Sequence, residues 1–288
     1  MLIGRLKMKK GALYVQNLND EEISAVKSLI KFYNEDHGIY FKFDPGFLTN
    51  PDEEANHILF YENDILTGYM SIDCYNGEEM EAAPIVDKED NFNKMHHFLF
   101  KNAKDKGKRK ILYIADRKFN FLGNCLNKME IPILFSEHRL DLDQSKFIPI
   151  ETCKLVIRDA ETIDKKAIFE LDKDAFNQSE DIDDEIKIEN VELSLTKVAL
   201  LDNEVIGKAR IFECDGTAGI YGFVVYPHLR GKGYGRAILS EIISMYLENG
   251  SQKIFLEVET ENEIAVHLYQ SVGFVIQSTF DYYQLNVV

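Results

Sequence analysis

The chain contains an internal repeat, and this repeat limits the possible folds more than any other feature of the sequence. The segment NDILTG at residues 63–68 matches DNEVIG at residues 202–207, so that Gly207 lies 139 residues after Gly68. Gly77 matches Gly216 at the same offset. Each segment is a turn between two apolar runs, which is the pattern of a β-hairpin. Repetition at a fixed offset predicts two copies of one structural unit.

Farther along the chain the offset grows to 143 residues. The matched pairs are Pro84 with Pro227, Gly107 with Gly250, Lys110 with Lys253 and Ile111 with Ile254. These matches predict that the first copy lacks four residues between its second turn and Pro84. We therefore expect two domains, residues 1–145 and residues 152–288, joined by a linker at 142–152 that contains Pro149. The alternative is that residues 1–145 form an unrelated α+β domain.

The second copy shows the alternation of strand and helix patterns in most detail. The predicted order is strand 154–158, helices 160–177 and 184–194, strands 196–202, 205–214 and 218–226, helix 235–249, strand 253–259, helix 262–271 and strand 274–286. This order is typical of an α+β fold, in which a mostly antiparallel mixed sheet has helices on both faces. With 45% hydrophobic residues, the chain can bury a substantial core in each half.

The charge and the cysteines exclude several classes of partner. The chain has 33 Lys+Arg against 49 Asp+Glu and a formal net charge of −16, which disfavours a nucleic-acid partner. It has neither the roughly 20-residue apolar stretch of a membrane span nor a signal-peptide pattern at its start. Its four cysteines are scattered without a CxxC pair. We expect a cytoplasmic protein, monomer or homodimer, without a membrane partner, disulfide or metal site.

The segment RGKGYGR at residues 230–236 lies between an apolar run that ends near Pro227 and an amphipathic helix. Its three glycines remove the β-carbons that would hold a ligand away from the backbone. The helix that follows offers unpaired N–H groups and the positive end of its dipole, both of which favour a pyrophosphate. The basic residues add positive charge. The segment is therefore a candidate phosphate-binding turn.

The turn has three other interpretations. The glycine spacing alone is also compatible with a simple strand-to-helix turn whose basic residues are solvated. A Walker loop would need Gly-Lys-Ser or Gly-Lys-Thr after four spacer residues. A dinucleotide-binding fingerprint would need a third glycine where Arg236 stands, although Glu257 lies near the expected ribose-binding acid.

Two motifs together resemble the GNAT acetyltransferase superfamily. The first runs Val225-x-Pro227 and then Arg230-x-x-Gly233-x-Gly235, which fills the V-x-P and Q/R-x-x-G-x-G/A signature. The second is LEVETENEIAVHLYQSVGF at residues 256–274, which matches L-E-V…N-x-x-A-x-x-L-Y-x-x-x-G-F. The resemblance covers residues 153–288. It implies acetyl-CoA as co-substrate and direct transfer of the acetyl group to an amine.

The resemblance also implies roles for individual residues. In the family, the fourth strand pairs with the pantetheine arm, the glycine turn binds the pyrophosphate, and an asparagine touches the cofactor. The residues that match these cofactor-binding positions are Phe223, Val224, Val225, Arg230, Gly231, Lys232, Gly233, Tyr234, Gly235, Arg236 and Asn262. Tyr269 matches the phenol that protonates the departing thiolate.

Acetyl transfer also needs a base, because an alkylamine with a pKa of roughly 10 must lose a proton before it attacks. Glu257 is the candidate base, since it matches the glutamate of the L-E-V motif in ribosomal-protein N-terminal acetyltransferases. It shares a strand face with Glu259, and both could simply be solvated. Likewise, Tyr269 could be an ordinary aromatic core residue. The alternative bases are Tyr221, Glu213 and Asp281.

The first copy lacks these chemical groups. At the offset of 143, residues 87–92 (DKEDNF) match residues 230–235, Phe119 matches Asn262 and Leu126 matches Tyr269. Acidic residues in this place would repel phosphate. We therefore expect one acetyl-CoA per chain. The acceptor is an amine, which would be cationic if the acidic run at 179–189 recruits it, although a solvated loop is the simpler interpretation. The alternative function is non-catalytic binding or sensing of acyl-CoA.

Overall fold

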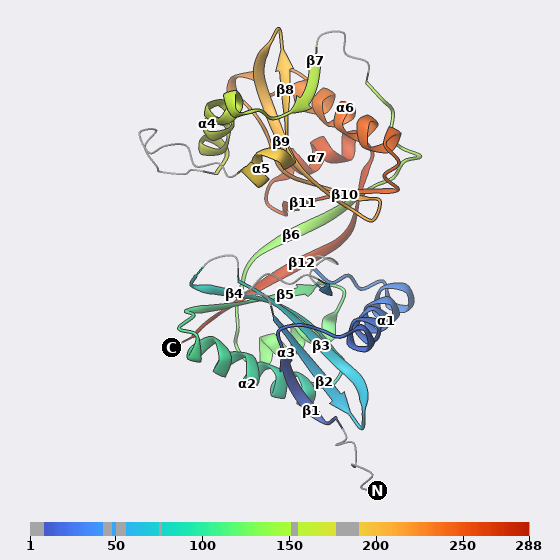
Figure 1. The fold of residues 1–288 in the computed structure, drawn as a ribbon, viewed down its shortest axis with the longest axis vertical. Helices are drawn as coiled ribbons and strands as arrows, with labels where there is room; N and C mark the ends of the chain where they lie inside the picture. The colour runs from blue at the N-terminus through green and yellow to red at the C-terminus, as the bar shows by residue number, and fades with distance from the viewer. Residues whose placement is uncertain are drawn as a thin grey trace, which may run out of the picture. The chain divides into compact units, whose positions relative to one another are not determined.

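A computed structural model describes residues 9–42, 48–49, 56–74, 77–150, 155–176 and 190–287 (Figure 1). The chain forms two compact units. The first unit comprises Met1–Glu137 together with Ser278–Val288, and the second unit comprises His138–Gln277. The acidic run at 179–189 and Cys153 lie outside the described residues.

The first unit is a six-stranded sheet in the order β1-β2-β3-β4-β5-β12. Only the β4–β5 pair is parallel among the pairings described for it. The strands are β1 (Gly11–Val15), β2 (Asn56–Glu62), β3 (Ile65–Asp73), β4 (Glu79–Val86), β5 (Lys110–Asp116) and the last part of β12 (Phe274–Asn286). The helices are α1 (Asp20–His37), α2 (Glu89–Asp105) and α3 (Asn120–Lys128).

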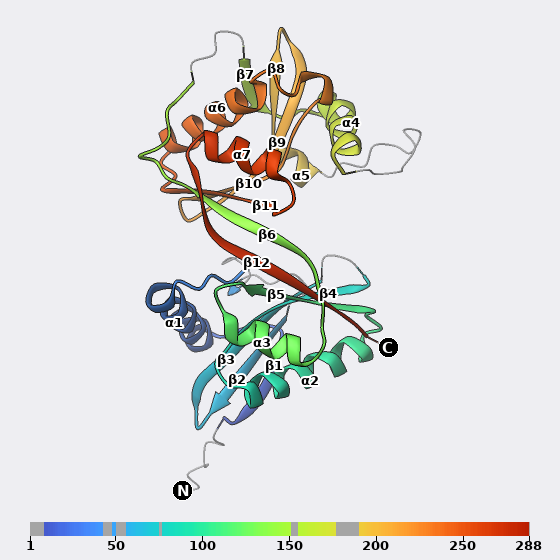
Figure 2. The same cartoon turned by 180° about the vertical axis from the view of Figure 1, so that it is seen from behind.

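Figures 1 and 2 show α1 on one face of this sheet and α2 with α3 on the other. The bounds of α1 follow from local chemistry. Asn19 caps its first turn in a capping box with Glu22, and Gly38 ends the helix in the left-handed region at φ 63°. Helices on both faces of a mostly antiparallel sheet confirm the predicted fold class.

The second unit repeats this order as β7-β8-β9-β10-β11-β6. Its strands are β7 (Leu155–Asp159), β8 (Thr196–Leu201), β9 (Glu204–Cys214), β10 (Thr217–Val225), β11 (Lys253–Glu259) and β6 (Ile133–Leu142). Its helices are α4 (Lys165–Phe176), α5 (Asn190–Leu195), α6 (Tyr234–Glu248) and α7 (Glu263–Ser271), with short 3-10 turns η2 (Thr162–Asp164) and η3 (Pro227–Leu229).

Apolar side chains on the two faces of the sheet pack against the helices and form two buried clusters. Ile238 and Ile242 of α6 and Tyr269 of α7 join one buried cluster. Ile168 of α4 and Leu193 of α5 join a separate cluster. The described strands and helices agree closely with the predicted ranges, except that only Asn190–Leu195 of the predicted helix at 184–194 is described.

The first pair of hairpin turns matches in detail. Asn63 and Asp64 have φ of 51° and 68°, and Asp202 and Asn203 have φ of 51° and 69°. Positive φ at both central residues is typical of type I′ turns. Each hairpin also contains a register shift at the same place, after Phe60 in one and after Ala199 in the other.

The second turn matches with a shift of one residue. The amides of Arg109 and Lys110 donate to the carbonyl of Glu78 at 2.7 and 3.2 Å, just as residues 252 and 253 donate to that of Gly216. Glu78, and not Gly77, therefore occupies the place of Gly216. The two glycines align in the sequence, but they do not have the same structural role.

Part of each of two strands, β6 and β12, belongs to the other unit than the one that the predicted division gives it. The second half of β6, from His138 onwards, belongs to the second unit. Just after the strand, the amide of Asp143 donates to the carbonyl of Gly273 and the Gln144 side chain donates to that of Gln252. The end of β12 belongs to the first unit, where it pairs with β5 from Phe280 onwards. The compact units therefore differ in their bounds from the predicted division at residues 145–152.

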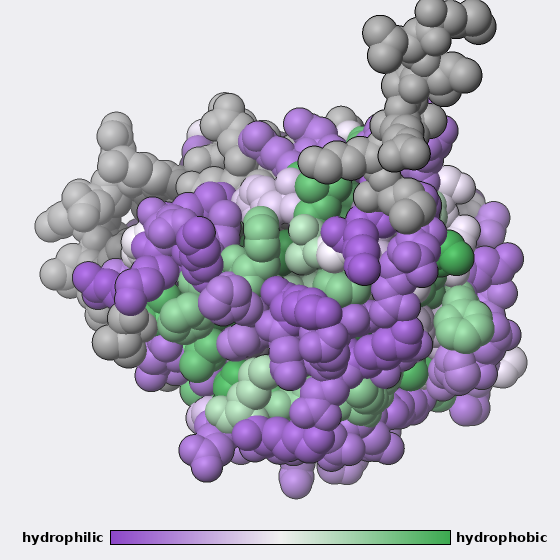
Figure 3. All heavy atoms as spheres, turned by 90° about the horizontal axis from the view of Figure 1, so that it is seen from below, coloured by the Kyte–Doolittle hydropathy of each residue, from purple (hydrophilic) through white to green (hydrophobic). Residues whose placement is uncertain are grey.

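The surface of the first unit that is visible in Figure 3 is largely hydrophilic, with apolar side chains in small patches between charged ones. In the part of the chain that the structure describes, no helix is long and apolar enough to cross a membrane. The described cysteines are the free thiols Cys74, Cys125 and Cys214.

Candidate active site

The strands β10 and β11 separate in the middle of the second unit. Their parallel pairing runs from Thr217 opposite Lys253 to Ile220 opposite Leu256 and then ends. On its other side, β10 pairs with β9 through a register shift between Tyr221 and Val224, which places one extra residue in β10. The edge of β10 beyond Ile220 therefore has backbone groups that a ligand can pair with, as an added strand would.

The turn that follows β10 spans eight residues, 226–233, and contains the predicted phosphate-binding segment. Gly231 and Gly233 have φ of 72° and 87°, and the position of a Cβ on either has open space around it. Gly233 is the N-cap of α6, and no side chain caps the first N–H groups of this helix. The turn thus leaves a helix N-terminus accessible, which is the arrangement that favours a bound phosphate.

Two of the three basic residues of the turn are held by neighbours. Arg230 Nε donates to the carbonyl of Val225 at 2.9 Å, and Arg236 Nε donates to Ser271 Oγ at 3.0 Å. Lys232 is exposed and has no ion pair with any residue in the described ranges. The arginines thus order the turn with one nitrogen each and keep their remaining N–H groups for a ligand.

Gly235 has a different structural role from Gly231 and Gly233. The position of its Cβ lies 3.3 Å from Leu268 of α7 and 3.9 Å from the ring of Phe223. It allows α6 to pack closely against α7 and the bulged part of β10. The ring of Phe223 in turn contacts that of Tyr269 edge-on, with the centroids 6.4 Å apart.

Tyr269 is buried on α7, and its ring also contacts Phe274. Burial raises the pKa of the Tyr269 phenol to about 12, because the charged form loses its hydration. The hydroxyl therefore keeps its proton at neutral pH. Such a group can donate a proton or a hydrogen bond to a developing thiolate, and it cannot serve as a resident base.

Glu257 is half-buried on β11. It lies on the same face as Phe255, because side chains two residues apart on a strand point the same way. The ring of Tyr221 contacts that of Phe255 at 6.0 Å, so Tyr221 shares this face. The structure thus brings Glu257 and Tyr221 to the two strands that separate.

The other two candidate bases are engaged elsewhere. Glu213 accepts a hydrogen bond from Ser251 Oγ at 2.5 Å. Asp281 lies in the first unit, where Arg117 and Ser136 Oγ donate to its carboxylate at 2.6 and 2.7 Å. Asp281 lies in the part of β12 that belongs to the first unit, a location that the sequence did not indicate.

Asn262 has a structural role, as a helix cap, that the sequence analysis did not predict. It is the N-cap of α7, and its side-chain oxygen accepts from the amide of Ala265 at 3.1 Å. Its side-chain amide group is exposed and keeps its two N–H donors. The motif position therefore fixes the start of α7 and still offers donors to a ligand.

Two ion pairs near the separated strands were also missed. Lys208 of β9 is fully buried and donates to Asp172 of α4 at 2.6 Å, while Arg210 Nη1 donates to Glu192 of α5 at 2.8 Å. Burial lowers the pKa of the Lys208 ammonium, and the hydrogen bond to Asp172 opposes this effect. The available signal was the pair of bases at alternate positions within the apolar middle of β9.

The corresponding place in the first unit lacks the turn. Only Asp87 and Lys88 connect β4 to α2, and Glu89 already begins the helix. The ungapped match of residues 87–92 to 230–235 is therefore wrong, because the turn is missing and not merely altered. Pro84 lies within β4 opposite Met70, so it does not correspond to Pro227. The four missing residues thus come from this connection and not from the stretch before Pro84.

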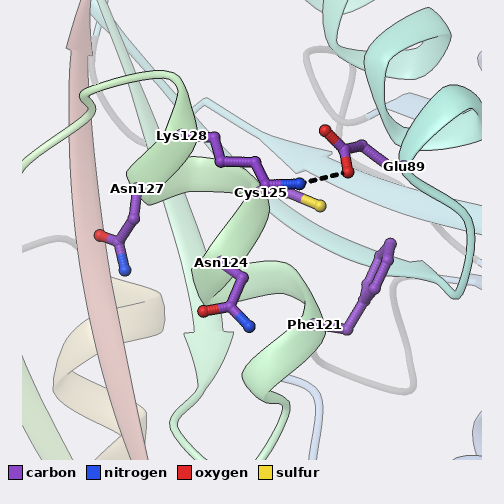
Figure 4. A pocket seen from close by; sticks show the side chains of 6 residues that line it. All are labelled: Glu89, Phe121, Asn124, Cys125, Asn127 and Lys128. Atoms are coloured by element: carbon purple, nitrogen blue, oxygen red, sulfur yellow. Dashed lines mark hydrogen bonds and ion pairs between the residues drawn. The ribbon is translucent and has the colours of Figure 1, made fainter.

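An ion pair occupies the start of α2. Figure 4 shows Glu89 and Lys128 pointing toward each other at a shallow pocket, and Lys128 Nζ lies 2.6 Å from the Glu89 carboxylate. The other lining residues come from α3 and are Phe121, Asn124, Cys125 and Asn127. A carboxylate here opposes the binding of phosphate.

At the positions of the first unit that match Asn262 and Glu257, the backbone has the same conformation or register, but the side chains differ. Phe119, the N-cap of α3, has φ −84° and ψ 64°, while Asn262 has φ −85° and ψ 63°. Phe119 makes no side-chain cap. Ile114 stands at the place of Glu257, because Lys110 and Lys253 begin β5 and β11 in equivalent registers.

Comparisons with known proteins agree with this geometry. The model of the acetyltransferase (GNAT) family matches residues 165–274. An L-amino acid N-acyltransferase of Escherichia coli (strain K12) is 38% identical over 52 residues, which are 18% of this chain and 30% of that protein. Matches to five curated relatives span from 14% to 44% of the relatives' own lengths.

Solved structures resemble the whole chain. A GCN5-related N-acetyltransferase from Sphaerobacter thermophilus has a TM-score of 0.72 at 14% identity, covering 98% of this chain and 97% of its own. A tandem GNAT protein from the clavulanic acid biosynthesis pathway has a TM-score of 0.70 at 11% identity, covering 96% and 99%. At these identities the likeness shows the fold. The chain has the tandem GNAT fold, and its residues 165–274 match the acetyltransferase (GNAT) family.

Proposed function

We propose that the second unit transfers the acetyl group of acetyl-CoA to a primary amine by direct attack. The observation that carries this proposal is the separation of β10 from β11 immediately before an uncapped, glycine-lined helix start. Backbone groups of Phe223, Val224 and Val225 would pair with the pantetheine arm, and the amides of residues 231–236 would bind the pyrophosphate.

The chemistry would then use two side chains. The amine nitrogen attacks the thioester carbonyl, the C–S bond breaks, and Tyr269 supplies a proton to the leaving thiolate. Glu257 accepts a proton from the amine, directly or through water. The ring of Tyr269 contacts that of Phe223 on β10, so the phenol lies near the separated strands. The first unit would bind no cofactor, because its connection between β4 and α2 is two residues long.

Calorimetry with coenzyme A tests the proposal, with Gly233→Ala as the variant and Gly107→Ala as the control. Both glycines have positive φ, 87° and 68°, and open space around a Cβ. Each substitution should therefore cost a similar backbone strain of about 1–2 kcal/mol. We expect Gly233→Ala to weaken coenzyme A binding about tenfold and Gly107→Ala to leave it unchanged. Absence of binding by the unaltered protein would refute the proposal.

Turnover separates this function from non-catalytic sensing of acyl-CoA. A transferase releases free thiol from acetyl-CoA in the presence of an amine, whereas a sensor binds without release. Screening amines, amino acids, polyamines, aminoglycosides and peptide N-termini for thiol release would identify the acceptor class.

A further inference from the structure

Arg210 of β9 has an unused hydrogen-bonding edge. Its Nη1 donates to Glu192, while its Nε is buried and has no hydrogen-bond partner among the described residues. A buried N–H without a partner is unfavourable and is uncommon in native structures. The Nε–H and Nη2–H groups form one side of the guanidinium fork, and this side matches the two oxygens of a carboxylate.

Gly222 lies against this edge of Arg210 and has no side chain to place on it. Both Nε and Nη2 lie 3.5 Å from the position of a Cβ on Gly222. Any side chain at this residue would pack on the edge. Gly222 lies within the register shift of β10 and has φ 53°, a conformation that favours glycine. The register shift of β10 therefore places a residue without a side chain beside the unpartnered edge of the guanidinium.

Arg210 lies in one row with the candidate base. It pairs directly with Tyr221 of β10, and directly opposed side chains share a face of the sheet. Tyr221 contacts Phe255, whose strand neighbour on the same face is Glu257. Paired strands are about 4.8 Å apart, and β10 and β11 are no longer paired at Tyr221 and Glu257. The row from β9 to β11 therefore spans about 10 Å or more, which is comparable with the length of a small molecule that has one charged group at each end.

We propose that the acceptor is an amino carboxylic acid, and that Arg210 binds its carboxylate while its amine lies toward Glu257. This inference rests on the proposed function and names the acceptor class. Glu192 holds Nη1 and so orients the fork. The reaction is the one described above: the amine nitrogen forms the amide bond, coenzyme A leaves as the thiol, and the carboxylate does not react.

The test compares each amino acid with its own amide, using the full-length protein. The amide lacks the negative charge and keeps the side chain. We measure kcat/KM from thiol release and expect the unaltered protein to prefer the acid about tenfold or more, as one charge-assisted bidentate contact provides. Arg210→Gln should abolish this preference while the amide reacts at nearly its original rate. Arg210→Lys should retain part of it.

A matched control is Arg158→Gln. Arg158 also forms a two-nitrogen contact with a carboxylate, that of Asp164, but it does so on β7. This variant should leave the preference for the acid unchanged. Calorimetry with coenzyme A on every variant shows whether the second unit is folded.

Three results would overturn the inference. One is equal use of acid and amide by the unaltered protein. Another is an equal loss with both acceptors in Arg210→Gln while coenzyme A binding is intact. Either of these leaves the proposed function standing. Absence of thiol release with every amine would instead refute the proposed function, and the acceptor class with it.

Discussion

The connection from β4 to α2 spans two residues in the first unit, whereas the connection from β10 to α6 spans eight in the second. The pairing of β4 with β3 runs without a register shift, whereas β10 carries a bulge against β9. Around these differences the two sheets have the same strand order and the same parallel central pair. Both central pairs even end after four residue pairs.

This comparison separates what the two units share from what only the second unit has. The separation of the two central strands is a property of the sheet, and both units have it. The bulge, the glycine turn and a few side chains are local additions to one of them. The features on which the proposed cofactor site depends can therefore differ between two units while the hydrogen-bonded framework stays the same. The predictions that follow test this division between framework and site.

The largest effect is expected from Tyr269→Phe. Removal of a general acid should lower kcat about 100-fold, with little change in the affinity for coenzyme A. The control is Tyr33→Phe in the first unit, because burial raises the pKa of Tyr33 to about 12 as well. Steady-state kinetics would show whether a buried phenol matters only in the second unit. A normal kcat in Tyr269→Phe would remove the phenol from the mechanism.

Glu257→Gln should lower kcat about 10- to 30-fold, because water can replace part of the function of a base. The loss should shrink as the pH rises, since more of the amine is then already neutral. Ile114→Val, at the matching place in the first unit, should leave kcat unchanged. The check is a pH–rate profile of the three proteins. A variant as active as the unaltered protein at neutral pH would return the search to Tyr221.

Asp281→Asn should affect stability and not catalysis. The carboxylate of Asp281 is buried and accepts from Arg117 and Ser136 in the first unit. Its removal should lower the free energy of unfolding by about 1–2 kcal/mol, measured by urea denaturation, while kcat stays the same. A lower kcat with normal stability would instead place Asp281 at the reaction centre.

The smallest effect concerns Glu81 of β4, which stands where the second unit has Gly219. Burial, with help from Asp73, raises the pKa of the Glu81 carboxyl to about 7. Because the folded state holds this proton more tightly than the unfolded chain does, its stabilising contribution is complete near pH 4 and is lost as the pH rises through 7. Glu81→Gln should therefore gain about 1 kcal/mol over the unaltered protein at pH 8.

Thermal or urea unfolding at pH 5 and pH 8 would measure this difference. The gain should be small at pH 5 and larger at pH 8. Glu21→Gln on the exposed face of α1 is the control and should show no such trend. A gain for Glu81→Gln that is independent of pH would mean that shape, and not charge, is responsible.

Much of this framework could be predicted from local sequence. Turn residues such as Asn63 and Asp202 specify hairpins through their own dihedral preferences, and the repeat of such signals indicated two copies. The glycine turn at 230–236 was predictable because its chemistry lies within seven consecutive residues. These features depend on neighbours in the sequence.

The features that were not predicted depend on distant partners. Nothing near Lys208 or Arg210 indicates that Asp172 and Glu192 will pair with them. The missing turn of the first unit was hidden because α2 begins early at Glu89, so that an ungapped match remained plausible. The strand exchange was invisible for the same reason, since β12 has an ordinary strand pattern whichever sheet it joins.

The exchange of β12 also has a consequence for synthesis on the ribosome. A domain usually folds as soon as its residues leave the exit tunnel. Here the part of β12 that belongs to the first unit begins at Ser278, long after Glu137 has emerged. At a synthesis rate of roughly 5–20 residues per second, several seconds or longer pass between the synthesis of β5 and that of β12, with which it pairs. During that interval the edge of β5 that pairs with β12 lacks this partner, and an unpaired strand edge is prone to mispairing.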